Sequence, residues 1–202
     1  MQSITRHLDR RTLFNLVGGG FLFGIGDVLY NHWNAPVIEP FTKGEQPVAV
    51  FVGGTGGIGG AMAKAFGKFS NGNASIIIIG RNRAAGEDIL SKLPKPQNPN
   101  VKHEFIQCDV TRMKNVRSVT QELLSRHPKI NYLVMTPGFT SLNGRNETEE
   151  GLDTKLAVHY YSRWKFTNDL LPALNQAKRE GEDAKVISVF SAGQGGRAYR
   201  LK

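Results

Sequence analysis

A glycine-rich loop between a strand-like and a helix-like segment constrains the fold more than any other feature of this sequence. Val48–Val52 is short, apolar and rich in β-branched residues, which predicts a buried strand. It is followed by Gly53-Gly-Thr-Gly-Gly-Ile-Gly59 and by Ile58–Phe69, whose apolar residues recur at helical spacing. Glycines at such a junction let a phosphate approach the unpaired N–H groups at the start of a helix. A P-loop is excluded because Gly60 stands where lysine would follow.

From residue 47 onward, strand-like and helix-like segments alternate. We expect further strands at 75–79, 101–107, 130–135 and 186–190, and helices at 83–93, 112–126 and 151–174, the last interrupted near its end by Pro172. Ser75-Ile-Ile-Ile-Ile79 has no polar face, which is typical of a strand covered by helices on both sides. The sequence therefore predicts an α/β fold, a Rossmann-type doubly wound parallel sheet in three αβα layers.

Residues 1–46 differ from the rest and predict an extension and linker before a domain over residues 47–202. Arg6, Arg10 and Arg11 precede an uncharged run, residues 13–26, which is shorter than the roughly 20 apolar residues that span a bilayer. Three interpretations stay open for this run: a loosely packed extension, a membrane-associated anchor or an organelle signal. We expect a cytoplasmic protein, with a membrane-associated or mitochondrial location as the alternatives.

Charge and composition exclude several functional classes. The chain has 26 Lys and Arg against 17 Asp and Glu, a net charge of +9, but these residues are spread along it. No nucleic-acid-binding arm is predicted, and we expect no nucleic acid partner. Cys108 is the single cysteine, which excludes a disulfide framework, and the five histidines do not have zinc-ligand spacing. We therefore expect no metal site.

The glycine loop and three later motifs resemble those of the short-chain dehydrogenase/reductase family. Val52–Gly59 is similar to the family's T-G-x-x-x-G-I-G pattern, with valine in place of the threonine. Gly80-Arg-Asn82 closes the second expected strand, Cys108-Asp-Val110 follows the third, and Thr136-Pro-Gly138 follows the fourth, where the family usually has N-A-G. The resemblance covers roughly residues 47–193. It implies an NAD(P)-dependent oxidoreductase that transfers a hydride between its cofactor and a small-molecule carbonyl or alcohol.

The resemblance also implies a set of cofactor-binding residues. Arg81 ends the second strand, where a guanidinium favours the 2′-phosphate of NADP and an acidic residue would favour NAD. We expect NADP rather than NAD, although Arg83 could share this role and Arg81 could be a solvated loop cation. Asp109 would meet the adenine ring, or could cap the helix that begins near Arg112. The expected set is Gly53, Thr55, Gly57, Ile58, Gly59, Arg81, Asn82, Asp109, Val110 and Gly138.

Two catalytic residues of the family have local counterparts. By resemblance, Ser191 occupies the position of the serine that polarises the carbonyl, and His159 the position of the family's asparagine. His159 could order a water in a proton relay or could be a packing histidine. Ser188 lies within an expected strand and is the poorer candidate for the serine. A G-x-S-x-G hydrolase motif is excluded by Val189.

The family's Tyr-x-x-x-Lys pair has no counterpart at the expected position. Tyr161 and Lys165 have the spacing, but they precede Ser191, whereas the family's pair follows its serine, so we interpret them as a coincidence. Tyr199 and Lys202 follow Ser191 with the wrong spacing. The chain is thus expected to lack the helix that carries the pair and the last strands of the fold. We expect weak or absent turnover; the alternatives are a non-catalytic nucleotide- or partner-binding module and a truncated gene product.

Overall fold

The computed structural model describes residues 46–190 except 98, 142 and 143. The chain divides into two compact units, Met1–Glu39 and Pro40–Lys202, and the described residues belong to the second. The expected extension and linker, and the candidates Ser191, Tyr199 and Lys202, lie outside the described residues. No helix within the described part combines the length and the apolarity that crossing a membrane requires.

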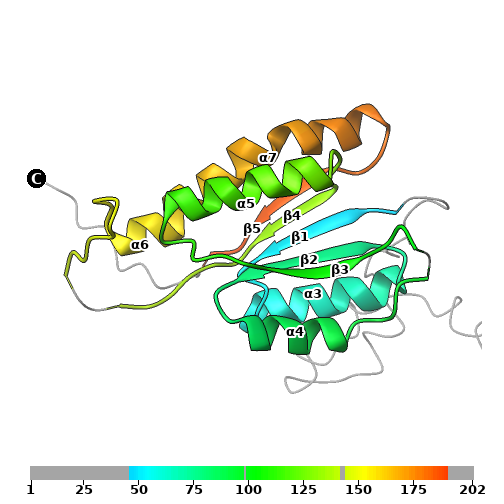
Figure 1. Ribbon diagram of the computed structural model, residues 1–202, viewed down its shortest axis with the longest axis horizontal. Helices are drawn as coiled ribbons and strands as arrows, with labels where there is room; N and C mark the ends of the chain where they lie inside the picture. The colour runs from blue at the N-terminus through cyan, green and yellow to red at the C-terminus, as the bar shows by residue number, and fades with distance from the viewer. Residues whose placement is uncertain (1–45, 98, 142–143, 191–202) are drawn as a thin grey trace, which may run out of the picture. The chain divides into compact units, whose positions relative to one another are not determined.

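A five-stranded parallel sheet forms the centre of the described unit (Figure 1). Its order is β3-β2-β1-β4-β5, and every neighbouring pair is parallel. The order reverses between β1 and β4, the place where open parallel sheets form a ligand-binding crevice. The predicted Rossmann-type topology is confirmed. The strands are β1 (Val48–Val52), β2 (Ser75–Gly80), β3 (His103–Gln107), β4 (Tyr132–Met135) and β5 (Lys185–Ser188).

Helices cover both faces of this sheet, which confirms the three layers. Helices α3 (Gly57–Ser70) and α4 (Arg83–Ser91) lie on one face, and α5 (Met113–Arg126) and α7 (Ser162–Arg179) on the other (Figure 1). Successive side chains of a strand point to opposite faces. In β2, Ile77 and Ile79 accordingly pack with the residues of α5 and α7, whereas Ile76 and Ile78 pack on the side of α3 and α4.

The last helical region differs from the prediction. It begins with α6 (Thr154–Leu156), passes through a π-helical turn, η2 (Ala157–Tyr161), and continues as α7 to Arg179. The expected interruption at Pro172 is wrong, because α7 runs through it. Pro172 and Asn168, whose carbonyl loses its N–H partner, are both exposed, so water can hydrate that carbonyl. The opposite side of the helix stays buried through Ala173, Leu174 and Ala177.

Smaller differences concern the ends of elements. Helix α4 stops at Ser91 instead of residue 93, and β3 starts at His103 instead of residue 101. Strand β5 ends at Ser188 rather than at residue 190, and all four of its residues are exposed. Among the described residues, β5 pairs with β4 and has a free outer edge.

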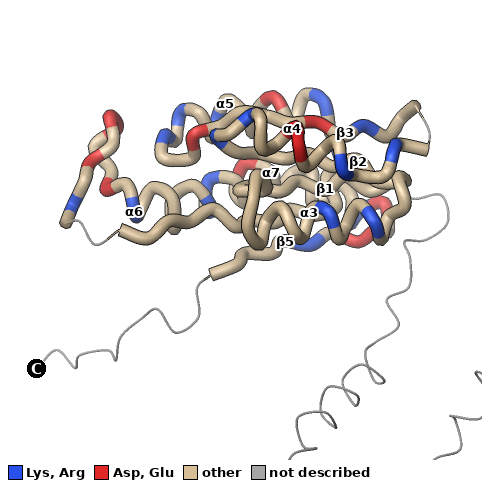
Figure 2. Tube along the Cα trace, turned by 90° about the horizontal axis from the view of Figure 1, so that it is seen from below, with Lys and Arg blue, Asp and Glu red and all other residues tan. Residues whose placement is uncertain are grey.

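Charged side chains are interspersed over the surface. Figure 2 shows Lys and Arg residues and Asp and Glu residues scattered among one another over the described part of the chain. Several basic residues form ion pairs one helical turn apart, such as Lys92 with Asp88 and Arg126 with Glu122. Exposed pairs of this kind contribute little to stability.

The thiol of Cys108 gives a pH-dependent contribution to stability. Burial, and secondarily the charge of Asp109, raises its pKa from 9.0 to about 12. Above pH 9.0 the unfolded chain therefore releases this proton while the folded protein keeps it, and stability falls as the pH rises. Between pH 8 and 10 we expect Cys108 to reduce the free energy of unfolding by about 1.4 kcal/mol, measured by urea denaturation.

Cys108→Ala is the control, because it keeps every other titrating group. The loss of stability between these two pH values should be larger in the wild type than in Cys108→Ala by that amount. Equal losses would contradict the buried, protonated thiol.

Candidate functional site

The glycine loop joins the carboxyl end of β1 to α3 in a crowded backbone arrangement. Gly53 donates its N–H to the carbonyl of Ile79 at 2.8 Å and has φ +81°. A Cβ on Gly53 would lie 2.8 Å from the nitrogen of Pro137, and a Cβ on Gly59 would lie 2.5 Å from the carbonyl oxygen of Gly53. The absence of side chains at these two positions lets α3 approach the ends of β1 and β4.

Gly56 and Gly57 have the opposite environment. A Cβ on either residue would meet no described atom within 4 Å, and Gly57 has φ +52°. Gly56 is the N-cap of α3, which has neither a side-chain cap nor an acidic residue in its first turn. Gly56, Gly57 and Ile58 are exposed, so within the described part of the chain the start of α3, with the positive end of its dipole, is open to a ligand. We call Gly56, Gly57 and the first turn of α3 the cradle; unpaired N–H groups at the start of a helix favour an anion such as a phosphate.

The residues around the cradle differ in how firmly they are held. The side chain of Thr55 packs on Gly80, where a Cβ would lie 2.5 Å from the Thr55 methyl carbon. Ile58, in the first turn of α3, is 62% exposed and presents an apolar side chain beside the cradle. The Asn82 side chain caps α4 by accepting the N–H of Ala85 at 3.1 Å.

Two arginines follow β2, and the structure distinguishes them. Arg83 is engaged: its guanidinium lies 3.4 Å from the Glu87 carboxylate and 5.3 Å from the centre of the Phe105 ring. Arg81 is exposed, and its backbone carbonyl accepts a hydrogen bond from Gln107 at 3.1 Å. No hydrogen bond or ion pair joins its guanidinium to another described residue. Arg81 is therefore the cation available to a ligand at the end of β2.

Asp109 does not cap the helix after it. Its carboxylate accepts the N–H and the hydroxyl of Thr111 at 3.0 and 2.8 Å. The start of α5 is held instead by the Glu150 carboxylate, which accepts the N–H groups of Met113 and Lys114 at 2.6 and 2.9 Å. The alternative capping role of Asp109 is thus wrong, since a residue from the distant loop after β4 satisfies those donors. Val110 is 8% exposed and belongs to the core.

The loop after β4 is held from two sides. The Thr136 hydroxyl lies 3.2 and 3.3 Å from the carbonyl oxygens of Val52 and Gly53. His159, within the π-helical turn, places Nε2 3.1 Å from the carbonyl oxygen of Phe139, and its ring would contact a Cβ on Gly138. His159 therefore holds the backbone at Gly138 and Phe139.

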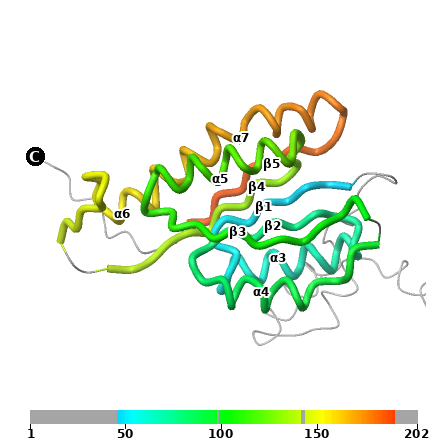
Figure 3. Tube along the Cα trace, in the orientation of Figure 1, coloured from blue at the N-terminus to red at the C-terminus, as the bar shows by residue number. Residues whose placement is uncertain are grey.

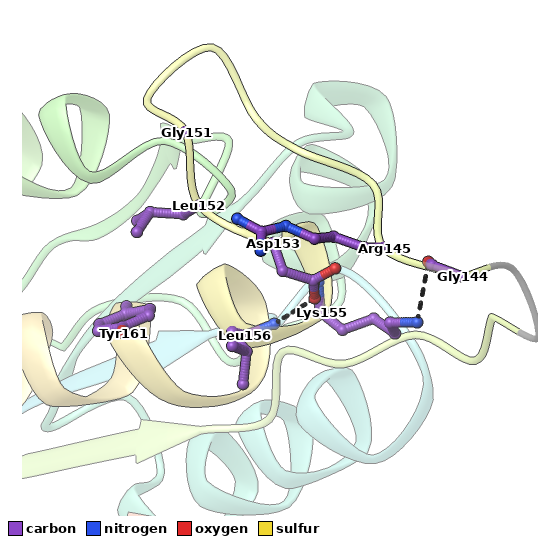
Figure 4. A pocket seen from close by; sticks show the side chains of 8 residues that line it. All are labelled: Gly144, Arg145, Gly151, Leu152, Asp153, Lys155, Leu156 and Tyr161. Atoms are coloured by element: carbon purple, nitrogen blue, oxygen red, sulfur yellow. Dashed lines mark hydrogen bonds between the residues drawn. The ribbon is translucent and has the colours of Figure 1, made fainter.

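The side chains of Tyr161 and Lys165 have different surroundings. Tyr161 lines a cavity of about 570 Å³ (Figure 4) at α6, beyond the carboxyl ends of the strands (Figure 3). Lys165 donates to Asp169 at 2.8 Å, and Asp169 also accepts the hydroxyl of Thr120 on α5. Burial would raise the pKa of Asp169, but the hydrogen bonds from Lys165, Thr120 and Asn168 and the charge of Lys165 together outweigh it and lower the pKa. The cavity is lined by Gly144, Arg145, Gly151, Leu152, Asp153, Lys155, Leu156 and Tyr161.

Sequence reasoning missed Arg163, which lies two residues before Lys165. Its guanidinium is buried and donates to the hydroxyl of Ser188 at 2.5 Å, so this serine is engaged within β5. The missed contacts of Arg163 and Glu150 join residues 25 to 37 positions apart. No local pattern signals such contacts.

Comparison with known proteins identifies the class to which this fold and loop belong. The short chain dehydrogenase family model matches residues 47–199. The chain is a member of that family, and its sequence departs from the family's usual motifs at the positions noted above.

Among curated proteins, oxidoreductase AN1596 of Emericella nidulans is 41% identical over 145 residues, which cover 72% of this chain and 42% of that protein. Human polyprenol dehydrogenase is 30% identical over 156 residues, 77% of this chain and 46% of that protein. This chain thus spans less than half the length of these relatives.

Solved structures share the fold at low sequence identity. An NADH-dependent reductase, A1-R′, complexed with NAD superposes with a TM-score of 0.58 and 24% identity over 75% of this chain and 63% of that one. The RhlG–NADP complex of Pseudomonas aeruginosa gives 0.59 and 21% over 80% of this chain and 61% of that one.

Proposed function

We propose that this chain binds NADP(H) in its Rossmann-type domain and serves as an oxidoreductase for a small-molecule carbonyl or alcohol. The observation that carries the proposal is the open cradle at Gly56 and Gly57 together with the guanidinium of Arg81, which no other described residue bonds. Membership of the short-chain dehydrogenase family supports it, as do family structures that contain NAD or NADP. NADP is proposed over NAD because a guanidinium pairs with a 2′-phosphate through charge-assisted bonds.

Each described residue has a definite part in this proposal. The N–H groups of the cradle bind the diphosphate, while Gly53, Thr55 and Gly59 shape the loop, and Ile58 offers apolar contact. Arg81 binds the 2′-phosphate, next to Asn82 in the loop after β2. Asp109 and Val110 line the adenine side, and Gly138 lines the nicotinamide side.

The chemistry belongs to the nicotinamide ring, which supplies or accepts the hydride when bound. His159 holds the loop after β4 through Phe139 and acts as a positioning residue. Ser191, which follows the last described residue, is proposed to polarise the substrate carbonyl.

A non-catalytic NADP(H)-binding module is the second candidate. The observation that favours it is the pairing of Lys165 with Asp169, which removes this lysine from any role beside Tyr161. Both candidates bind the dinucleotide, and they differ in turnover.

Removal of the Arg81 guanidinium tests the proposed cofactor. Arg81→Ala should weaken NADPH binding by about 10- to 100-fold, because it removes charge-assisted bonds to the 2′-phosphate. NADH, which lacks that phosphate, should bind with nearly unchanged affinity. Both dissociation constants are measured by fluorescence titration.

Arg83→Ala is the matched control, because Arg83 is a neighbouring cation already engaged with Glu87 and Phe105. It should change NADPH affinity less than about threefold, because the substitution removes only an exposed ion pair, which contributes little. A large loss in Arg83→Ala, or equal losses for both dinucleotides in Arg81→Ala, would refute the assignment of Arg81.

Tyr161→Phe tests whether the Tyr161–Lys165 spacing has chemical meaning. Any NADPH-dependent reduction of a panel of aldehydes and ketones should proceed at an unchanged rate in this variant, because Lys165 is bonded to Asp169. A fall of about 10²-fold or more would instead identify Tyr161 as the proton donor. Steady-state rates at saturating NADPH measure the difference.

A further inference from the structure

Arg163 places a buried guanidinium between the ends of two strands. The residue is 7% exposed and lies near the start of α7. One terminal nitrogen donates to the carbonyl of Met135 at 3.0 Å and to the hydroxyl of Ser188 at 2.5 Å. The other donates to the carbonyls of Pro137 and Val189 at 2.7 and 2.9 Å. Two of these four acceptors belong to the end of β4 and its following loop, and two to the end of β5.

This arrangement is unfavourable for a residue that serves packing alone. Among the described residues, no carboxylate pairs with Arg163, and its Nε is buried without a hydrogen-bond partner. Burial disfavours the charged form and lowers the pKa of the guanidinium. Replacement of a buried charge by a well-packed apolar side chain is often neutral or stabilising. A role in holding particular backbone groups explains why a guanidinium stands here.

The end of β4 that Arg163 holds leads to the glycine loop, and the end of β5 leads along the chain to Ser191. The segment after β4 touches the glycine loop, because a Cβ on Gly53 would lie 2.8 Å from the nitrogen of Pro137. The segment after β5 passes through Phe190, whose ring centre lies 4.4 Å from the Arg163 guanidinium carbon, and then enters Ser191. The stacked aromatic ring adds a cation–π contact to the hydrogen bonds.

We propose that Arg163 is a positioning residue that ties the end of β5 to the end of β4, so that dinucleotide binding at the cradle also stabilises the end of β5 at Val189 and Phe190. The tie follows from the contacts of Arg163 alone. The coupling to the dinucleotide rests on the proposed NADP(H) binding, and the two parts are tested separately.

Amide hydrogen exchange of the full chain, followed by NMR, tests the tie without ligand. The Val189 N–H is a direct reporter, since it donates at 2.9 Å to the Met135 carbonyl that Arg163 also holds. Arg163→Met should speed its exchange by about 10- to 100-fold, the effect expected for lost hydrogen bonds to a charged group. Arg163→Lys, which keeps a cation with fewer donors, should give a smaller increase and remains informative if Arg163→Met does not fold.

Lys165→Met is the matched control, because it removes a half-buried cation of the same helix that bonds to Asp169 and to no strand end. Its Val189 exchange should change less than about twofold once the change in global stability is subtracted. If either Arg163 variant speeds Val189 exchange no more than Lys165→Met does, the tie is refuted.

Addition of NADPH tests the coupling. In the wild type and Lys165→Met, NADPH should slow exchange at Val189 and at Thr136, whose N–H donates to Val52 at 2.9 Å beside the glycine loop. In both Arg163 variants the slowing should persist at Thr136, while at Val189 it should disappear in Arg163→Met and diminish in Arg163→Lys; a purely structural role would preserve the ratio of the two effects. Undiminished slowing at Val189 in these variants would overturn the coupling.

Absence of slowing at both amides in the wild type would refute NADP(H) binding and the coupling together. The ligand-free comparison would then decide the tie alone.

Discussion

The close approach of α3 to the ends of β1 and β4 is the contact on which the rest of the site depends. It requires a backbone without side chains at Gly53 and Gly59, where a Cβ would overlap neighbouring backbone atoms. The same approach aims the first turn of α3 into the crevice where the strand order reverses. In the proposed function, the anion site is therefore built from N–H groups and the helix dipole, and Arg81 is proposed to discriminate between the dinucleotides.

The elements around the glycine loop could be predicted because each has a strong local pattern. The β-branched run of β1, the unbroken isoleucines of β2 and the helical spacing of α3 all agree with one topology, and the structure confirms it. Pro172 was mispredicted because its local preference opposes a helix, whereas burial of the opposite face of α7 holds the helix together. Tertiary packing decides such conflicts, and a single sequence does not reveal it.

The contacts that hold the site together were less accessible to prediction. The cap of α5 by Glu150 and the bonds from Arg163 to the two strand ends form between distant segments, and neither residue type has a characteristic spacing in such a role. The glycine positions and Arg81 could be put forward from the sequence because backbone geometry and charge at the ends of strands follow general rules, and their roles remain predictions. His159 was found by resemblance, and its contact with Phe139 became apparent from the structure.

The described domain thus combines a cradle of backbone groups with a buried arginine, Arg163, that bridges the ends of β4 and β5. The first depends on small residues, and the second on a charge that no carboxylate of the described residues pairs. If the proposed functions hold, the cradle binds the dinucleotide, and Arg163 transmits this binding to the end of β5 at Val189 and Phe190.

Whether the cradle holds the dinucleotide is measured by titrating NADPH into two variants of one residue, Gly57→Ala and Gly57→Asp. Aspartate tolerates φ +52° at least as well as alanine does, and in both variants the new Cβ meets no described atom within 4 Å, but only aspartate places a negative charge at the start of α3. We predict that Gly57→Ala retains measurable NADPH affinity and that Gly57→Asp binds at least about 100-fold more weakly than Gly57→Ala. Equal affinities in the two variants, with both proteins folded, would contradict the cradle as the dinucleotide site.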